Sequence, residues 1–201
     1  MANMIRKASV FEIANHWTMA LSCLVLAITG YGFLFHLEGL NSVFGSYAQM
    51  KVIHNYAGIV FSVNIFFTLF LYLPDALSWG SDDITWLLKG GGYLSKGHVN
   101  VPPQGKINSG QKLFYLAFLV AGLAISISGF VIWLMPGVKN YILLSHLAHN
   151  IAFDFIVFAI PAHGYLGSLA NPGTLQIMIS GMVPVEWARK RHGKWVREMG
   201  Y

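Results

Sequence analysis

Four histidines lie at the ends of long apolar stretches of this 201-residue chain. They are His16, His54, His149 and His163. An imidazole inside a bilayer is costly unless it is hydrogen-bonded, hydrated or bound to a cofactor, so each one is a candidate for function. One such histidine alone is commonly a hydrogen-bonded core residue. Two pairs at matched depths instead predict opposed imidazoles that hold two haem irons in a helix bundle.

The helical phase of the last apolar stretch favours two stacked sites. His149 and His163 are 14 positions apart, which on a helix leaves them about 40° from a common face and roughly 21 Å apart along the axis. One helix can therefore supply a ligand to each of two irons. His146 competes for the first position, but its phase differs from that of His163 by about 100°, so we prefer His149.

The other histidines and the single cysteine narrow the cofactor chemistry. His36 and His98 fall in predicted connections and His192 in a basic tail, where a solvated or interfacial imidazole is usual. Cys23 is the only cysteine, which excludes an intrachain disulfide, a four-cysteine iron–sulfur site and covalent haem attachment through C-x-x-C-H. We therefore expect haem that is held without a covalent bond.

The composition indicates which elements position these histidines. Hydrophobic residues make up 55% of the chain and charged residues 10%, whereas about a quarter of the residues of a soluble domain are charged. Four stretches are long enough to cross a hydrocarbon core as helices, at about 17–36, 53–73, 113–135 and 141–169. The predicted fold class is all-α, an integral membrane four-helix bundle that forms a single domain over residues 1–201.

The positive charges predict the orientation of these spans. Of the 13 lysines and arginines, all but Lys51 and Lys139 lie before the first span, between the second and third spans, or after the fourth. The positive-inside rule then places both termini and the loop 74–112 in the cytoplasm. His16 and His163 become an inner pair, and the other two histidines become an outer pair. Because the basic residues flank apolar stretches, the net charge of +5 indicates topology and not nucleic acid binding.

Two short segments are expected to lie on the membrane surface. Residues 82–88 of the inner loop predict a short amphipathic helix, with Trp79 and Trp86 at the level of the lipid headgroups. Residues 184–191 predict a basic helix in the cytoplasmic tail 172–201. Contact with membrane lipid is the simplest role for that helix, and the acidic surface of a partner protein is the alternative.

Five segments of the chain match a known family in order and spacing. They are His16-Trp17-Thr18, Ile53-His54, Asn108-Ser109-Gly110-Gln111-Lys112, Ser128-Gly129-Phe130-Val131-Ile132-Trp133 and Trp187-Ala188-Arg189-Lys190-Arg191-His192. In these segments, and over nearly its whole length, the chain resembles the membrane cytochrome b (gamma) subunit of respiratory formate dehydrogenases. The Asn-x-Gly-Gln-Lys segment and the basic tail are the more specific matches.

The resemblance implies a multi-pass subunit of the bacterial cytoplasmic (inner) membrane with two haem b groups. The axial ligands that it implies are His54 with His149 for the outer haem, and His16 with His163 for the inner haem. These are the same two pairs that the topology indicates. The chain departs from the family at Asp154, a mid-span carboxylate that we expect to be buried, neutral and hydrogen-bonded.

The resemblance also implies the partners and the electron acceptor. An outer iron–sulfur subunit would donate electrons, a catalytic molybdenum or tungsten subunit would oxidise formate, and quinone (menaquinone or ubiquinone) would be reduced at the inner side. Formate oxidation would therefore not occur on this chain. The implied quinone contacts are Asn108, Gly110 and Gln111, although Asn108 equally fits a helix cap.

Two other functions remain open from the sequence. The cytochrome b subunit of a membrane-bound hydrogenase or related reductase would use the same histidines with a different electron donor. A metal or proton transporter would line a path with the four histidines and Asp154 and would bind no haem. A haem absorption spectrum separates the transporter from the cytochromes, and the co-purifying subunits identify the donor.

Overall fold

Long apolar helices dominate the computed structural model, which describes residues 3–92 and 100–201. Within those residues, four helices are long and apolar enough to cross a membrane: α1 (Val10–Leu34), α3 (Tyr47–Leu77), α5 (Ser109–Leu134) and α6 (Lys139–Gly167). They contain most of the predicted spans and extend beyond the apolar runs at several ends. The prediction of an all-α membrane bundle is confirmed.

The shorter elements connect these helices and follow them. They are β1 (Met4–Arg6), α2 (Glu38–Val43), α4 (Ser81–Leu88), the 3-10 turn η1 (Gly90–Gly92), α7 (Leu175–Ser180), β2 (Met182–Pro184), α8 (Val185–Arg191) and α9 (Gly193–Glu198). The chain divides into two compact units. The terminal unit comprises Met1–Ile13, Leu69–Ala117 and Gly167–Tyr201, and the four-helix unit comprises Ala14–Thr68 and Phe118–Leu166.

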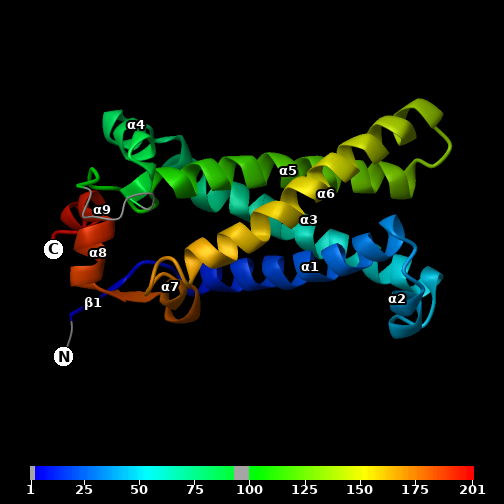
Figure 1. Ribbon diagram of the computed structural model, residues 1–201, viewed down its shortest axis with the longest axis horizontal. Helices are drawn as coiled ribbons and strands as arrows, with labels where there is room; N and C mark the ends of the chain where they lie inside the picture. The colour runs from blue at the N-terminus through cyan, green and yellow to red at the C-terminus, as the bar shows by residue number, and fades with distance from the viewer. Residues whose placement is uncertain (1–2, 93–99) are drawn as a thin grey trace. The chain divides into compact units, whose positions relative to one another are not determined.

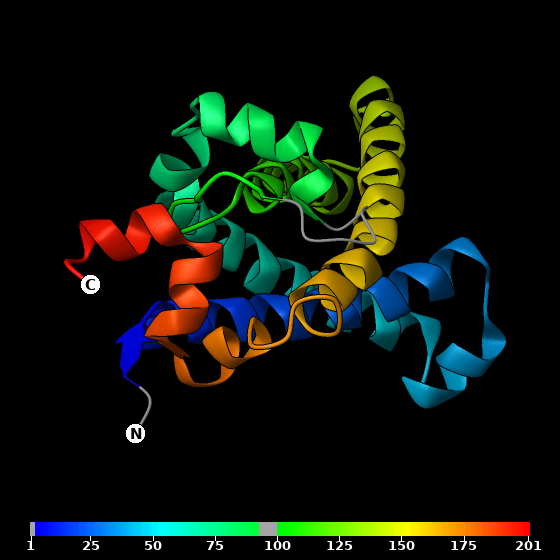
Figure 2. The same cartoon turned by 60° about the vertical axis from the view of Figure 1, so that its left-hand side comes forward.

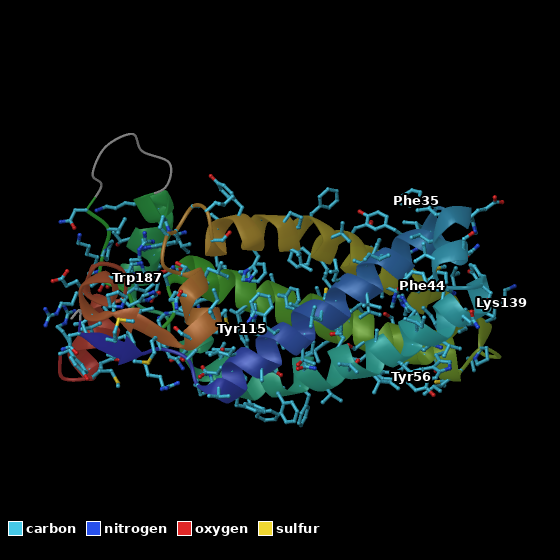
Figure 3. All side chains as sticks on the ribbon, turned by 90° about the horizontal axis from the view of Figure 1, so that it is seen from below. Phe35, Phe44, Tyr56, Tyr115, Lys139 and Trp187 are labelled. Atoms are coloured by element: carbon cyan, nitrogen blue, oxygen red, sulfur yellow. The ribbon has the colours of Figure 1, made fainter. Side chains whose placement is uncertain are left out.

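Both connections inside the four-helix unit lie at the same end of its helices. Figure 1 shows α2 between α1 and α3 at that end, together with the short link from α5 to α6. Phe35, Phe44, Tyr56 and Lys139 all lie toward it in the side-chain view (Figure 3). This is the arrangement expected when antiparallel spans are joined by short loops on one side of a membrane.

The four-helix unit has a narrow packed interior and an apolar exterior. Phe61 and Ile65 of α3 are buried, and the Phe61 ring meets that of Phe118 on α5 edge-on at 6.3 Å between centroids. A Cβ on Gly122 would lie 2.5 Å from Ile65 Cδ1, so this glycine allows α5 to approach α3 closely. Outward residues such as Phe158, which is 80% exposed, are apolar as well. Lipid tails are the surroundings that suit such a surface.

The terminal unit contains a small core that the sequence did not predict. Strand β1 pairs antiparallel with β2, with Met4 opposite Pro184, and Figure 2 shows the N-terminal strand beside the segment that leads into α8. The buried residues of this core are Ile5, Ala8, Ile177, Val183, Val185, Ala188, Trp195 and Val196. The basic tail therefore forms a packed structure with the N-terminal segment, and α8 buries one face in it.

Trp86 and His192 are buried, contrary to the predictions for these two segments. Helices α4 and α8 form where short helices were predicted, but Trp86 is buried and packs against Gly110 instead of facing lipid headgroups. His192 is only 2% exposed and its Nδ1 lies 2.8 Å from the Gly105 carbonyl, so the expectation of a solvated imidazole is wrong. Burial, together with the nearby positive charge of Lys7, lowers the pKa of His192 to about 3.

A buried ion pair joins α4 to the start of α5 in the terminal unit. Lys112 Nζ lies 2.8 Å from Asp83 Oδ1, and both residues are buried. Ser109 donates a second hydrogen bond to that oxygen, and the Gly80 amide donates to Asp83 Oδ2. Burial alone would raise the pKa of Asp83, but the bonds from Lys112, Ser109 and Gly80 together hold it below its usual value.

We predict that Asp83→Asn destabilises the protein markedly, because it leaves the buried Lys112 ammonium without a counter-charge. Loss of one partner of a buried pair costs about 3–5 kcal/mol. Asp82→Asn is the matched control, since Asp82 pairs with Lys194 at 2.7 Å in an exposed position, where such pairs contribute about 0–1 kcal/mol. Thermal unfolding in detergent measures both variants, and equal midpoints for the two would contradict the prediction.

The buried Asp83–Lys112 pair makes the stability of the folded chain depend on pH in the acid range. The pKa of Asp83 is lower in the folded chain than its ordinary value, so its contribution to stability is complete above the unfolded value of about 4. That contribution is lost as the pH falls from there through the folded pKa. In Asp83→Asn this part of the acid sensitivity should disappear, which unfolding midpoints measured at falling pH will show.

Candidate functional site

The predicted histidines meet as two facing pairs inside the four-helix unit. The rings of His16 on α1 and His163 on α6 have centroids 6.2 Å apart. Those of His54 on α3 and His149 on α6 have centroids 6.4 Å apart. Helix α6 therefore contributes one imidazole to each pair, 14 positions apart in the sequence.

These separations match two imidazoles bound to one metal ion. A metal–imidazole bond is about 2.0–2.1 Å long and the nitrogen lies roughly 1.2 Å from its ring centre, so two rings on opposite sides of one ion have centroids about 6.4–6.6 Å apart. Among the described residues, no three histidine, cysteine, aspartate or glutamate side chains gather as a metal site. Two protein ligands suit a metal whose remaining ligands come from a macrocycle, which is the case for haem iron.

Two hydroxyl groups contact the rings of the outer pair. Thr29 Oγ1 on α1 lies 2.7 Å from His54 Nδ1, and Ser128 Oγ on α5 lies 3.1 Å from His149 Nδ1. Each hydroxyl also donates to a carbonyl of its own helix, Thr29 to Val25 at 2.8 Å and Ser128 to Ala124 at 2.6 Å. With its hydrogen directed to the carbonyl, the hydroxyl oxygen accepts from Nδ1–H of the histidine. The Nε2 lone pair then remains for a metal.

Neither hydroxyl was predicted as part of the site from the sequence. Serine and threonine in helices commonly bond to a carbonyl three or four residues earlier, and both residues do so here. Their second contact joins residues 25 and 21 positions apart on different helices. No local spacing signals such a contact, so only the packing of the helices reveals it.

The inner pair has different surroundings. His16 Nδ1 is buried and has no hydrogen-bond partner among the described residues, and the His16 ring meets that of Trp17 edge-on at 5.4 Å. His163 is exposed on α6. The inner pair thus joins a partly buried imidazole to an exposed one.

The remaining histidines lie away from the two pairs or cannot be placed. His146 and His36 are exposed, and His36 has a positive φ of 49° in the turn after α1. His98 lies outside the described residues. Asp154 is exposed on α6. The expectation of a buried carboxyl at this position is therefore wrong.

The glycines near the pairs differ in what they allow. A Cβ on Gly129 would lie 3.2 Å from His149 Cε1, so this glycine makes room for the His149 ring. Gly30 and Gly32 instead admit the side chains of Phe153 and Met50, which is ordinary helix packing. A Cβ on Gly164, one position after His163, would meet no other part of the described chain within 4 Å, apart from its own helix and neighbours.

The three residues proposed for quinone lie together at the start of α5, in the terminal unit. Gln111 N–H donates to Asn108 Oδ1 at 2.8 Å, and Asn108 N–H donates to Gln111 Oε1 at 2.9 Å. This reciprocal capping box satisfies two amide groups at the helix N-terminus. A Cβ on Gly110 would lie 3.1 Å from the Trp86 ring, so close packing requires that glycine. Each residue thus has a structural role here, whether or not it also binds a ligand.

Comparisons with known proteins agree with a haem-binding membrane bundle. The chain is 29% identical over 208 residues to the nitrate-inducible formate dehydrogenase cytochrome b556(Fdn) subunit of Escherichia coli K12, covering 98% of this chain and 93% of that protein. It is 29% identical to the formate dehydrogenase cytochrome b556(fdo) subunit of the same strain, covering 94% and 90%. It is 27% identical to the formate dehydrogenase cytochrome b556 subunit of Haemophilus influenzae, covering 92% and 79%.

A family model described as prokaryotic cytochrome b561 matches residues 7–183, which include all four paired histidines and both hydroxyl residues. This match covers most of the chain, including every long helix. The chain is a multi-pass membrane protein that belongs to the prokaryotic cytochrome b561 family.

Proposed function

We propose that this chain is the di-haem cytochrome b subunit of a membrane-bound formate dehydrogenase and that it carries electrons across the cytoplasmic membrane to quinone. The observation that carries the proposal is the presence of two imidazole pairs, each with the ring separation of ligands to one metal ion. The names of the relatives support the assignment to formate dehydrogenase.

In this proposal His54 and His149 hold the outer haem, and His16 and His163 hold the inner haem. When bound, the two haems supply one-electron carriers at two depths of the bundle. The apolar helices exclude water from the bound groups, and α6 fixes their spacing because it carries one ligand of each pair. No covalent link is involved, because the single cysteine cannot form the attachment motif.

The distribution of positive charge supports an inward direction of transfer. Lys51 and Lys139 are the lysines near the two connections of the four-helix unit, whereas the other 11 basic residues flank the opposite helix ends or lie in the loop and tail there. The positive-inside rule then places those connections, with the His54 and His149 pair nearer to them, on the outer side. Both chain termini are cytoplasmic in this orientation.

Quinone reduction is proposed at the inner side, with Asn108, Gly110 and Gln111 among its contacts. A quinone carbonyl that becomes a hydroxyl needs a hydrogen-bond donor close to it. The capping box uses the side-chain oxygens of Asn108 and Gln111 as acceptors, so each side chain keeps its amide NH₂ as a donor. The substrate would be menaquinone or ubiquinone, and protons would be taken up from the cytoplasmic side.

The proposed partners are an iron–sulfur subunit and a catalytic molybdenum or tungsten subunit. This chain has one cysteine, which cannot hold a cluster, so the clusters that deliver electrons must belong to another subunit. Formate oxidation would occur on the catalytic partner. Co-purification from membranes followed by mass identification tests the complex, and a hydrogenase partner in place of these subunits would contradict the assignment to formate dehydrogenase.

We predict that His149→Ala removes one of two haems, whereas His146→Ala removes none. The physical reason is that the His149 ring faces His54, while the His146 side chain is exposed. Haem per polypeptide, measured by pyridine haemochrome on the purified complex, checks both variants. Loss of one haem in His146→Ala, with both haems retained in His149→Ala, would contradict the prediction and identify His146 as the outer ligand.

We also predict that Asn108→Asp lowers quinone reduction at least about tenfold, which corresponds to about 1.4 kcal/mol in the barrier. Aspartate keeps the cap oxygen at this position but removes the amide donor. Reduction of both haems by formate, and the haem content, serve as controls and should be unchanged. If this variant reduces quinone at the rate of the unchanged protein, the quinone site lies elsewhere.

A further inference from the structure

The two hydroxyl groups beside the outer histidine pair are buried in the interior of the four-helix unit. Thr29 has no exposed surface and Ser128 is 4% exposed. At such a position no water can replace either hydroxyl as the partner of an imidazole N–H. The hydrogen bond at His54 Nδ1 therefore depends on Thr29, whereas His149 has the Ile125 backbone as a second hydrogen-bond partner beside Ser128.

The two hydroxyls act on their rings in the same way. Each hydroxyl oxygen lies within hydrogen-bond distance of an Nδ1 and directs its own hydrogen to a helix carbonyl. A histidine that binds a metal through Nε2 must carry its proton on Nδ1, and that proton needs an acceptor. The geometry of both hydroxyls thus fits metal-bound imidazoles and fixes the same tautomer in both.

A hydrogen bond from Nδ1–H also changes the donor strength of the ring. As the proton is drawn toward the acceptor, the imidazole becomes a more basic ligand. A more basic ligand stabilises ferric iron more than ferrous iron, so the reduction potential of the bound group falls. At the inner pair, His16 Nδ1 has no acceptor among the described residues, so this ligand lacks the same effect.

We propose that Thr29 and Ser128 are positioning residues of the outer haem: they accept the Nδ1–H bonds of its two ligands, fix their tautomer and lower its reduction potential. The inference rests on the proposed di-haem function and adds a reason why electrons would move from the outer haem to the inner haem. A lower potential at the outer haem makes electron transfer toward the inner haem favourable. Thr29 and Ser128 would do this without touching the electron donor, the quinone or the iron.

The test is a spectroelectrochemical titration of the purified complex with Thr29→Val and Ser128→Ala. Valine has nearly the shape of threonine without the acceptor, and the His149→Ala protein shows which component belongs to the inner haem. We expect the potential of the outer haem to rise in both variants and that of the inner haem to stay unchanged. We also expect the outer haem to bind about 10–100-fold more weakly in these variants, because the hydrogen bond to a ligand ring is lost.

Two matched controls separate this effect from general packing damage. Thr29→Ser keeps the hydroxyl and should restore the potential and the haem content. Ser62→Ala removes a hydroxyl of α3 that bonds to the Gly58 carbonyl at 2.7 Å instead of to a histidine, and it should change neither potential. Loss of only the outer haem in Thr29→Val, restored by Thr29→Ser, supports the proposal as well.

Three outcomes would overturn the inference. The first is two retained haems with unchanged potentials in both Thr29→Val and Ser128→Ala. The second is an equal shift in Ser62→Ala, and the third is loss of both haems in Thr29→Val with unchanged potentials in Ser128→Ala. Failure of the proposed function is recognised separately, because the unchanged protein would then bind fewer than two haems.

Discussion

The facing imidazole pairs are the constraint on which the rest of the four-helix unit depends. A cofactor held by two imidazoles requires rings that stay on opposite sides of one metal ion, with their centres about 6.5 Å apart. Here α1 and α3 each supply one ring and α6 supplies the opposite ring twice, with centroid separations of 6.2 and 6.4 Å. Spacing along a single helix therefore sets the distance between the two sites.

Few polar contacts join the helices that carry these rings: one is the bond from Asn15 Nδ2 on α1 to Thr68 Oγ1 on α3 at 2.8 Å, and two lie at the paired histidines. Thr29 ties α1 to His54 of α3, and Ser128 ties α5 to His149 of α6. In a membrane, where burial of apolar surface does little to drive helices together, such interhelical bonds and close glycine contacts contribute much of the specificity. The same bonds hold the His54 and His149 rings in place and join the helices that carry them.

The terminal unit follows a different physical logic. Its small apolar core, a two-stranded pairing of the chain ends and the buried Asp83–Lys112 pair resemble the interior of a soluble domain. Its capping box at Asn108 and Gln111 gives α5 a defined beginning. The segment proposed for quinone is thus held by hydrogen bonds and close packing, which help to hold a binding site in place.

Periodicity and charge predicted the four long helices, and helical phase selected His149 over His146 for the position that faces His54. These features are encoded locally, in the apolar runs and in the angle between residues on one helix. The contacts of Thr29, the strand pairing of Met4 with Pro184 and the burial of His192 join residues far apart in the chain. No local pattern encodes them, because they depend on how the helices and the chain ends pack. The exposure of Asp154 was missed for the same reason.

The haem content of the purified chain tests the central claim most directly. Two pairs with the spacing of axial ligands predict two haem b groups per polypeptide, both removed by acid–acetone because no covalent attachment is available. Pyridine haemochrome analysis before and after extraction gives both numbers. Close to two haems per chain, all extractable, is the expected result. One haem per chain, none, or haem that stays with the protein after extraction would contradict it.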